Sequence, residues 1–277
     1  MTFKRITINP YRIALYLLIA LFLLFYLVPM YVTLSTALKR PADISLAETW
    51  LFPGEPYWQS FGDAFNVLGR YFLNSVILTV SGTVLSALLG SLNGYIFAKW
   101  QFRGSELVFT LFLLGMYIPY QIILIPLFQL LRTIGLYGGL PGLILAHVVY
   151  GIPITTLIFR NFYGQIPRSI LDSAKVDGAG FYGIFGRIMI PLSIPGFVVV
   201  GIWQFTQIWN EFLWGITLTE QSANPITVGL AQLAGGQAVT WNLPMAGSII
   251  AAAPVVLIYI FLGQYFIRGL LGGSVKE

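Results

Sequence analysis

The stretch that decides the fold class runs from Phe72 to Ala98 and reads FLNSVILTVSGTVLSALLGSLNGYIFA. It contains no Asp, Glu, Lys or Arg. A hydrocarbon core of about 30 Å needs about 20 helical residues, whereas a strand of a membrane barrel needs roughly half as many. The stretch therefore predicts a helix that crosses a lipid bilayer.

Charge-free stretches of similar length recur on both sides of this one. They are Ile13–Val32, Leu107–Leu131, Leu136–Phe159, Ile188–Trp209 and Ala246–Ile267. Hydrophobic residues make up 57% of the chain and charged residues 9%, against about 25% charged residues in ordinary soluble domains. Because so little polar surface is available, lipid must cover the apolar side chains. We predict an all-α membrane protein with six transmembrane helices.

The basic residues indicate the orientation of these helices. Eleven fall on the side that holds both termini: Lys4, Arg5, Arg12, Lys99, Arg103, Arg160, Arg168, Lys175, Arg187, Arg268 and Lys276. Four fall on the other side: Lys39, Arg40, Arg70 and Arg132. Cytoplasmic loops carry the excess of Lys and Arg, so both termini are predicted to be cytoplasmic in a multi-pass protein of the cytoplasmic (inner) membrane.

This topology divides the chain into four parts. Residues 1–32 are expected to form a cytoplasmic N-terminus and the first transmembrane helix, 33–71 an external loop, 72–267 the main transmembrane domain, and 268–277 a cytoplasmic tail. Within the main domain the loop 160–187 faces the cytoplasm. It is long enough to be more than a turn.

The composition excludes several kinds of chemistry. Cysteine is absent and histidine occurs once, so we predict no metal site and no cofactor. The net charge of +5 reflects membrane topology, and lipid rather than nucleic acid is the expected contact. No Gly-x-x-x-x-Gly-Lys-Ser/Thr motif occurs, so the chain has no phosphate-binding loop of its own. The sequence predicts a transport subunit that is not an enzyme.

The cytoplasmic loop 160–187 predicts a short helix, a glycine hinge and a second helix. Pro167 suits the first helical position, Ser169–Asp177 allows about two turns, and Gly178 suits a left-handed C-terminal position. A second helical stretch, Phe181–Ile190, is stopped or kinked by Pro191 and again at Pro195. Taken alone, this pattern is also typical of an amphipathic hairpin at the membrane surface without a partner.

The amino-acid sequence of this loop resembles the EAA loop of binding-protein-dependent ABC importer permeases. Asp172-Ser173-Ala174 stands where that family has Glu-Ala-Ala, Gly178 matches its glycine, and Ile188, Ile190 and Pro191 close the motif. Two of the first three positions depart conservatively from the family pattern. The resemblance implies that the loop couples the chain to an ATPase. The residues implied in this coupling are Ile170, Leu171, Asp172, Ser173, Ala174, Asp177, Gly178 and Ala179.

Other segments extend the resemblance to nearly the whole chain. Asn74-Ser75, Ile118-Pro119 and Trp209-Asn210 look like the corresponding segments of sugar-importer permeases. The chain resembles the smaller, six-helix subunit of the maltose-type class, most closely the glucose and mannose permeases. This implies a type I ABC importer transmembrane domain that forms half of the pathway. It also implies three partners: a homologous second permease, a cytoplasmic ATPase dimer and an extracytoplasmic binding protein that delivers a glucose- or mannose-type sugar or an oligosaccharide.

A passage for sugars needs amides, hydroxyls and aromatic planes rather than fixed charges. Gln204, Gln207 and Glu211 share one helical face, with Trp203 and Asn210 on an adjoining face. The predicted pathway residues are Tyr117, Tyr120, Gln121, Gln204, Gln207 and Asn210. For each of them taken singly, the sequence favours a hydrogen bond between membrane helices over a sugar contact, and such a hydrogen bond is also the role expected of His147.

The remaining sequence features are a pair of glycines and the ionisable residues that other classes of membrane protein would need. Gly90 and Gly94 form a small-xxx-small pair that allows a close helix contact. An intramembrane enzyme would need acidic, His or Cys clusters, of which the chain offers only Asp172 with Asp177. An ion-coupled carrier would usually need ionisable groups within its spans. The alternatives left open are an ABC importer permease for a solute other than sugar and an ion-coupled carrier.

Overall fold

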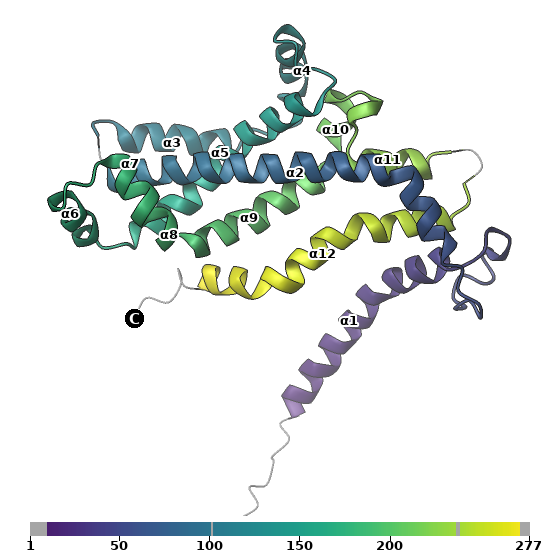
Figure 1. The fold of residues 1–277 in the computed structure, drawn as a ribbon. Coiled ribbons are helices and arrows are strands. Elements are labelled where there is room, and N and C mark those ends of the chain that lie inside the picture. Colours follow the sequence, from purple (N-terminus) through teal and green to yellow (C-terminus); the bar gives the residue numbers. More distant parts are fainter. Residues whose placement is uncertain (1–9, 101, 237–238, 272–277) are drawn as a thin grey trace, which may run out of the picture. The chain divides into compact units, whose positions relative to one another are not determined.

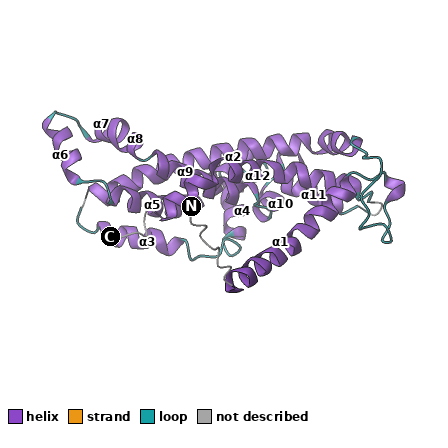
Figure 2. Ribbon diagram, turned by 90° about the horizontal axis from the view of Figure 1, so that it is seen from below, coloured by secondary structure: helices purple, strands orange, loops and turns teal. Residues whose placement is uncertain are grey.

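The computed structural model describes residues 10–100, 102–236 and 239–271. The basic residues Lys4, Arg5 and Lys276, which entered the prediction of topology, lie outside these residues. The chain divides into two compact units, residues 1–67 with 232–250 and residues 68–231 with 251–277. In the described ranges the chain folds into helices, and its one β-type pairing is an isolated bridge between Gly138 and Thr219 (Figure 2).

The first unit contains α1 (Pro10–Ala37), the short helix η1 (Pro41–Asp43) and the initial parts of α2 (Gln59–Lys99) and α12 (Asn242–Leu271). Its core consists of three alanines, Ala37, Ala64 and Ala246, which allow these helices to approach closely. The Asn242 side-chain amide donates a 3.1 Å hydrogen bond to the Ser60 hydroxyl within the same unit. Because α1 ends at Ala37 and α2 begins at Gln59, both helices extend beyond their charge-free stretches into residues 33–71, which were expected to form the external loop.

The second unit holds the rest of α2 and α12 and a series of helices between them. They are α3 (Ser105–Gly115), α4 (Leu124–Thr133), α5 (Leu140–Gly164), α6 (Arg168–Val176), α7 (Phe181–Ile184), η2 (Phe185–Met189, a π-helix), α8 (Ile190–Leu192), α9 (Ile194–Trp209), α10 (Leu213–Leu218), η3 (Gln221–Ala223) and α11 (Ile226–Ala234). Helices α6 and α7 lie at one end of α5 and α9, and α4 and α10 lie toward the other end (Figures 1 and 2).

Four helices of the described chain are long and apolar enough to cross a membrane: α1, α2, α5 and α12. A fifth span is formed if Phe181–Leu192 and Ile194–Trp209 are counted together, although they bend by 75° at their junction. Pro195 follows this junction and lacks an N–H for a helical hydrogen bond, as the sequence led us to expect for a break here. The fifth predicted span is thus a bent pair of helices.

The predicted span Leu107–Leu131 is divided in the structure. It forms two shorter helices, α3 and α4, separated by turns between Gly115 and Leu124. Pro119 lies in this segment, where it removes a backbone donor and disfavours a helical conformation for Ile118. The all-α membrane fold is confirmed, while the count of six spans and the cytoplasmic position of the termini stay predictions.

Glycines on α2 allow it to lie directly against α5. A Cβ atom at Gly90 would lie 2.9 Å from the carbonyl carbon of Thr155, and one at Gly94 would lie 2.8 Å from the backbone nitrogen of Arg160. Real Cβ atoms are not found so close to backbone atoms. The small-xxx-small prediction is confirmed, and α5 is the neighbour.

We therefore predict that Gly94→Ala lowers the stability of the protein by about 1–3 kcal/mol, because the added methyl group must push two helix backbones apart. Thermal unfolding of the detergent-solubilised protein measures the effect. Gly62→Ala in the same helix is the matched control, since a Cβ there meets nothing within 4 Å. Equal melting temperatures for the two variants would contradict the close contact of α2 with α5.

Candidate functional site

A cavity of about 380 Å³ lies in the second unit, among α5, α9 and α10. Ligand pockets in proteins commonly measure roughly 300–1,000 Å³. Its lining combines aromatic rings, amides, one imidazole and one carboxyl group. The lining residues are Met116, Tyr120, His147, Tyr150, Gly151, Ile154, Trp203, Gln204, Gln207, Ile208, Asn210, Glu211 and Trp214.

Four of the six predicted pathway residues line this cavity. They are Tyr120, Gln204, Gln207 and Asn210. Tyr117 and Gln121 do not belong to the lining, and the Tyr117 side chain is 82% exposed in the chain by itself. Both residues lie with Tyr120 in the segment between α3 and α4, and their role in a pathway stays a prediction.

Three aromatic and imidazole groups of the cavity were missed as pathway residues by the sequence analysis. The Trp214 ring is buried and lies edge-on to Tyr150 and Tyr120, with ring centroids 5.4 and 5.8 Å away. His147 lies 5.1 Å from the same ring. The spacing of His147 and Tyr150, three residues apart on one helix, is the signal that would have brought them together. Nothing in the sequence pattern indicated Trp214, which follows the end of α9.

Gly151 allows a glutamine side chain to reach the cavity wall. A Cβ atom at Gly151 would collide with the side-chain amide nitrogen of Gln204 and lie 3.1 Å from the Ser86 hydroxyl oxygen. Gln204 is 4% exposed. Its amide therefore occupies the space that a side chain on α5 would otherwise fill.

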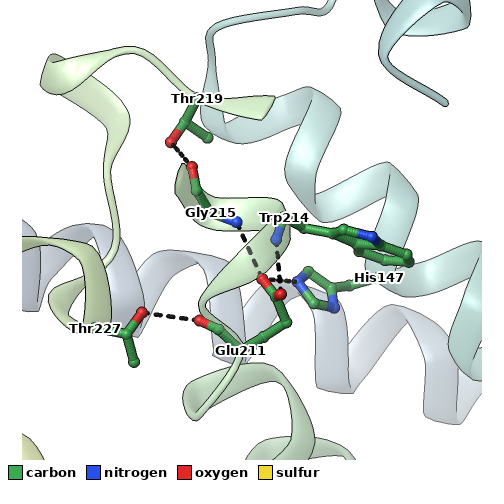
Figure 3. A network of polar contacts seen from close by, with 6 residues as sticks. All are labelled: His147, Glu211, Trp214, Gly215, Thr219 and Thr227. Carbon is green, nitrogen blue, oxygen red and sulfur yellow. Dashed lines mark hydrogen bonds and ion pairs between the residues drawn. The ribbon is translucent and has the colours of Figure 1, made fainter. Parts of the chain in front are cut away.

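The Glu211 carboxylate organises the turn between α9 and α10 (Figure 3). Its two oxygens accept hydrogen bonds from the backbone N–H groups of Trp214 at 2.7 Å and Gly215 at 3.0 Å. Thr227 of α11 donates a 2.8 Å hydrogen bond to the Glu211 carbonyl oxygen. Burial raises the pKa of the Glu211 carboxyl from its ordinary value, and the backbone hydrogen bonds oppose this rise because they favour the ionised form.

His147 faces the Glu211 carboxylate from α5. The distance from its Nε2 atom to the nearer Glu211 oxygen is 3.9 Å, which is too long for a hydrogen bond. Nε2 is buried and has no hydrogen-bond partner in the structure. At this atom the expected hydrogen bond to a neighbouring helix is not formed.

A second candidate site is α6, at the opposite end of α5. The predicted short helix is confirmed: it spans Arg168–Val176, with Pro167 at the preceding N-cap position. Leu171 and Ala174 are buried. Ile170, which precedes Leu171 in the helix, is 39% exposed, because a nine-residue helix buries only the side chains one turn apart. Asp172, Ser173, Asp177 and Gly178 are exposed, and Ala179 is half-buried.

Gly178 ends α6 in the left-handed conformation, with φ of +82°. The N–H of Gly178 donates to the Lys175 carbonyl oxygen at 3.0 Å, and the N–H of Ala179 donates to that of Ala174 at 2.9 Å. These bonds satisfy carbonyl groups that the helix end leaves open. The expected left-handed glycine is confirmed.

Aromatic side chains connect this region to the long helices. Tyr95 of α2 contacts Phe181 and Phe185, with ring centroids 5.0 and 5.4 Å away. The Tyr163 hydroxyl of α5 lies 2.6 Å from the Ser91 hydroxyl and 3.1 Å from the Ser193 hydroxyl. Leu171 and Ala174 belong to the same buried cluster as these two tyrosines. Packed side chains and hydroxyl groups therefore connect α6 to α2, α5 and the start of α9.

No metal centre was found in the part of the chain that the structure describes, where no three His, Cys, Asp or Glu side chains gather. The two candidate sites are therefore the cavity and the short helix α6, toward opposite ends of α5.

Residues 90–272 match the model of the binding-protein-dependent transport system inner membrane component family. The chain belongs to this family. A probable ABC transporter permease protein of Pyrococcus horikoshii is 42% identical over 271 residues, covering 97% of this chain and 98% of the relative. A xylose/arabinose import permease protein of Haloferax volcanii is 34% identical, covering 95% and 93%.

A solved structure shares the fold of this permease. It is a bacterial ABC transporter involved in the import of the acidic polysaccharide alginate, with a TM-score of 0.81, 20% sequence identity and coverage of 96% of this chain and 100% of the solved chain. The permease therefore has the fold of a type I ABC importer transmembrane subunit, as the sequence predicted.

Glu211→Ala is predicted to lower the stability of the permease by about 1–3 kcal/mol, because the Trp214 and Gly215 N–H groups lose their acceptors in a buried turn. Glu220→Ala removes an exposed carboxylate from the same connecting segment and should have little effect. Thermal unfolding of both variants in detergent provides the comparison. If Glu220→Ala proves as damaging as Glu211→Ala, the assignment of Glu211 as the organiser of this turn is wrong.

Proposed function

We propose that this permease forms half of the translocation pathway of an ATP-driven sugar importer in the cytoplasmic membrane. The observation that carries the proposal is the cavity lined by amides and aromatic rings in a member of the ABC importer permease family. Amides bind sugar hydroxyl groups, and aromatic faces pack against the apolar C–H faces of a sugar ring. The xylose/arabinose permease among its relatives supports the same substrate class.

The cavity supplies the sugar contacts of this subunit. Tyr120, Gln204, Gln207 and Asn210 are the pathway residues that both the sequence and the cavity support. Trp203, which the sequence placed beside Asn210, joins them at the rim with 41% of its surface exposed. A glucose- or mannose-type sugar or an oligosaccharide is the proposed cargo, delivered by an extracytoplasmic binding protein.

The helix α6 is the proposed contact with the ATPase. Its exposed face presents Asp172, Ser173 and Asp177 together with the end at Gly178, while Leu171 and Ala174 anchor it to the protein. Closure of a cytoplasmic ATPase dimer would displace α6 and, through Tyr95 and the Tyr163 hydroxyl, move α2, α5 and α9 as rigid bodies. Energy for transport then comes from the partner ATPase, since the sequence has no phosphate-binding loop.

A second, homologous permease completes the pathway in this proposal. The chain by itself leaves many apolar side chains exposed along α1, from Tyr11 to Leu34, and lipid and the second permease would cover them. Both termini and α6 are proposed to face the cytoplasm, whereas the cavity-lining residues of α5, from His147 to Ile154, precede its α6 end.

The remaining candidate functions predict different behaviour. An ABC importer permease for a non-sugar solute would keep the α6 contact but need no aromatic and amide lining. An ion-coupled carrier would keep transporting after the ATPase is inactivated. Deleting the gene and measuring uptake of labelled glucose, mannose, xylose and arabinose tests the sugar assignment, with loss of uptake of at least one sugar expected.

The permease alone is predicted not to transport sugar, because it holds half of a pathway and no ATP site. Reconstitution of the purified chain into vesicles should give no accumulation against a gradient. Purification through a tag on the chain should instead yield a second permease and an ATPase dimer. Concentrative uptake by the chain alone would refute the proposal.

Gly178→Asp is predicted to abolish sugar uptake while membrane insertion and permease pairing persist. A side chain with a Cβ costs about 1 kcal/mol or more at this positive φ, and the aspartate adds bulk and charge to the docking surface. Nothing lies within 4 Å of a Cβ at this position, so the core of the chain is undisturbed. Copurification of the ATPase and sugar uptake are the two measurements.

Gly183→Ala is the control for this experiment. Gly183 lies in α7, has no positive φ, and a Cβ there meets only the Ala179 methyl group at 3.9 Å. Normal ATPase copurification is expected for this variant. If Gly178→Asp also retains the ATPase and transports normally, α6 is not the coupling helix, and the hairpin is an interfacial element without a partner.

A further inference from the structure

The cavity is asymmetric in charge. Among the described residues that line it, Glu211 is the one carboxyl group and none is Lys or Arg. A carboxylate on a ligand would therefore enter without a cationic partner on this subunit. Burying an unpaired carboxylate is costly, and the cost rises when a second carboxylate lies nearby.

Backbone N–H groups hold the Glu211 carboxylate in place at the cavity wall. Its two oxygens accept hydrogen bonds from Trp214 and Gly215, and the backbone N–H groups of Leu213 and Phe212 also favour the ionised carboxylate. Because the backbone bonds fix the side chain, the carboxylate cannot swing away from an anionic ligand.

His147 is a second polar group of the cavity lining that points to a ligand. The residue is 7% exposed and its Nε2 atom has no hydrogen-bond partner in the structure. Buried polar groups in proteins are almost always hydrogen-bonded, and an unsatisfied one is costly. Nε2 lies 3.9 Å from Glu211 at the cavity wall, with the Trp214 ring beside it (Figure 3). A sugar hydroxyl group satisfies an imidazole nitrogen whether that nitrogen donates or accepts.

We propose that this cavity binds uncharged sugars and, through the fixed charge of Glu211, rejects sugars that carry a carboxylate. The proposal rests on the proposed function and narrows its substrate class. The fold itself does not decide the charge of the cargo, because the solved alginate importer shares it. The discrimination comes from the Glu211 side chain and the lack of a basic residue among the described lining residues.

Matched sugar pairs test the charge discrimination. Glucose, galactose and mannose differ from glucuronate, galacturonate and mannuronate in having a hydroxymethyl group in place of the carboxylate. The assembled importer is purified through a tag on this chain, placed in lipid nanodiscs without its binding protein, and tested for equilibrium binding of each labelled sugar. At least one neutral sugar should bind about tenfold or more tightly than its uronate, because the uronate must bury an unpaired charge.

Two variants assign the effect to this cavity. Glu211→Gln keeps an acceptor for the α10 turn but removes the charge, and should reduce the preference for the neutral sugar several-fold. Gln207→Arg adds a guanidinium group to the lining without touching that turn, and should raise uronate affinity. Glu220→Gln is the matched control, since that carboxylate is exposed and does not line the cavity. It should leave the preference unchanged.

Three outcomes would overturn the proposal: equal binding of a uronate and its neutral partner, no binding of any neutral sugar, or an unchanged preference in both cavity variants. These outcomes are separate from failure of the proposed function. If deletion of the gene abolishes sugar uptake and the binding preference is absent, the sugar importer stands and the charge selection by Glu211 is wrong. If deletion leaves the uptake of all sugars unchanged, the sugar importer itself is wrong.

Discussion

The close contact between α2 and α5 is the constraint on which the second unit depends. Gly90 and Gly94 remove the side chains that would hold the two backbones apart. In lipid, helices gain little from apolar burial, so close packing and hydrogen bonds must hold them together. Since α5 carries His147 near one end and Tyr163 near the other, this contact fixes the cavity wall and the anchor of α6 with respect to each other.

Helix breaks provide the functional parts of the fold. A continuous helix satisfies its own backbone groups, whereas each break leaves groups that need other partners. At the turn after α9 the partner is the Glu211 carboxylate, which thereby comes to face the cavity. At the end of α6 the partners are backbone N–H groups made available by the left-handed Gly178. The same chemistry that completes each helix end also shapes the adjoining site.

In the proposed function, the two ends of α5 have different roles. The cavity end gathers uncharged hydrogen-bonding groups and aromatic rings around one fixed carboxylate, which suits a neutral solute that must bind weakly enough to leave again. The α6 end exposes charged and small residues above a buried aromatic cluster, which suits docking of another protein. At the α6 end, Tyr95 and Tyr163 connect α6 and α7 to the long helices α2 and α5 through packed rings and hydroxyl groups rather than through a flexible linker.

The sequence by itself determined the membrane helices, the absence of a phosphate-binding loop, the short helix ending at Gly178 and the close approach of α2 to a neighbour. Each of these follows from local patterns: charge-free length, a motif, a left-handed glycine, and glycines four residues apart. The sequence also predicted that Gln204, Gln207 and Glu211 lie on one face, because they share one helix and its end.

Only the tertiary structure decided which helix the glycines meet, that Tyr117 and Gln121 lie outside the cavity lining, and that His147 and Trp214 belong to it. Those outcomes depend on the break between α3 and α4 and on the turn after α9, where hydrogen bonds between residues on different elements, rather than helical periodicity, set the direction of the side chains.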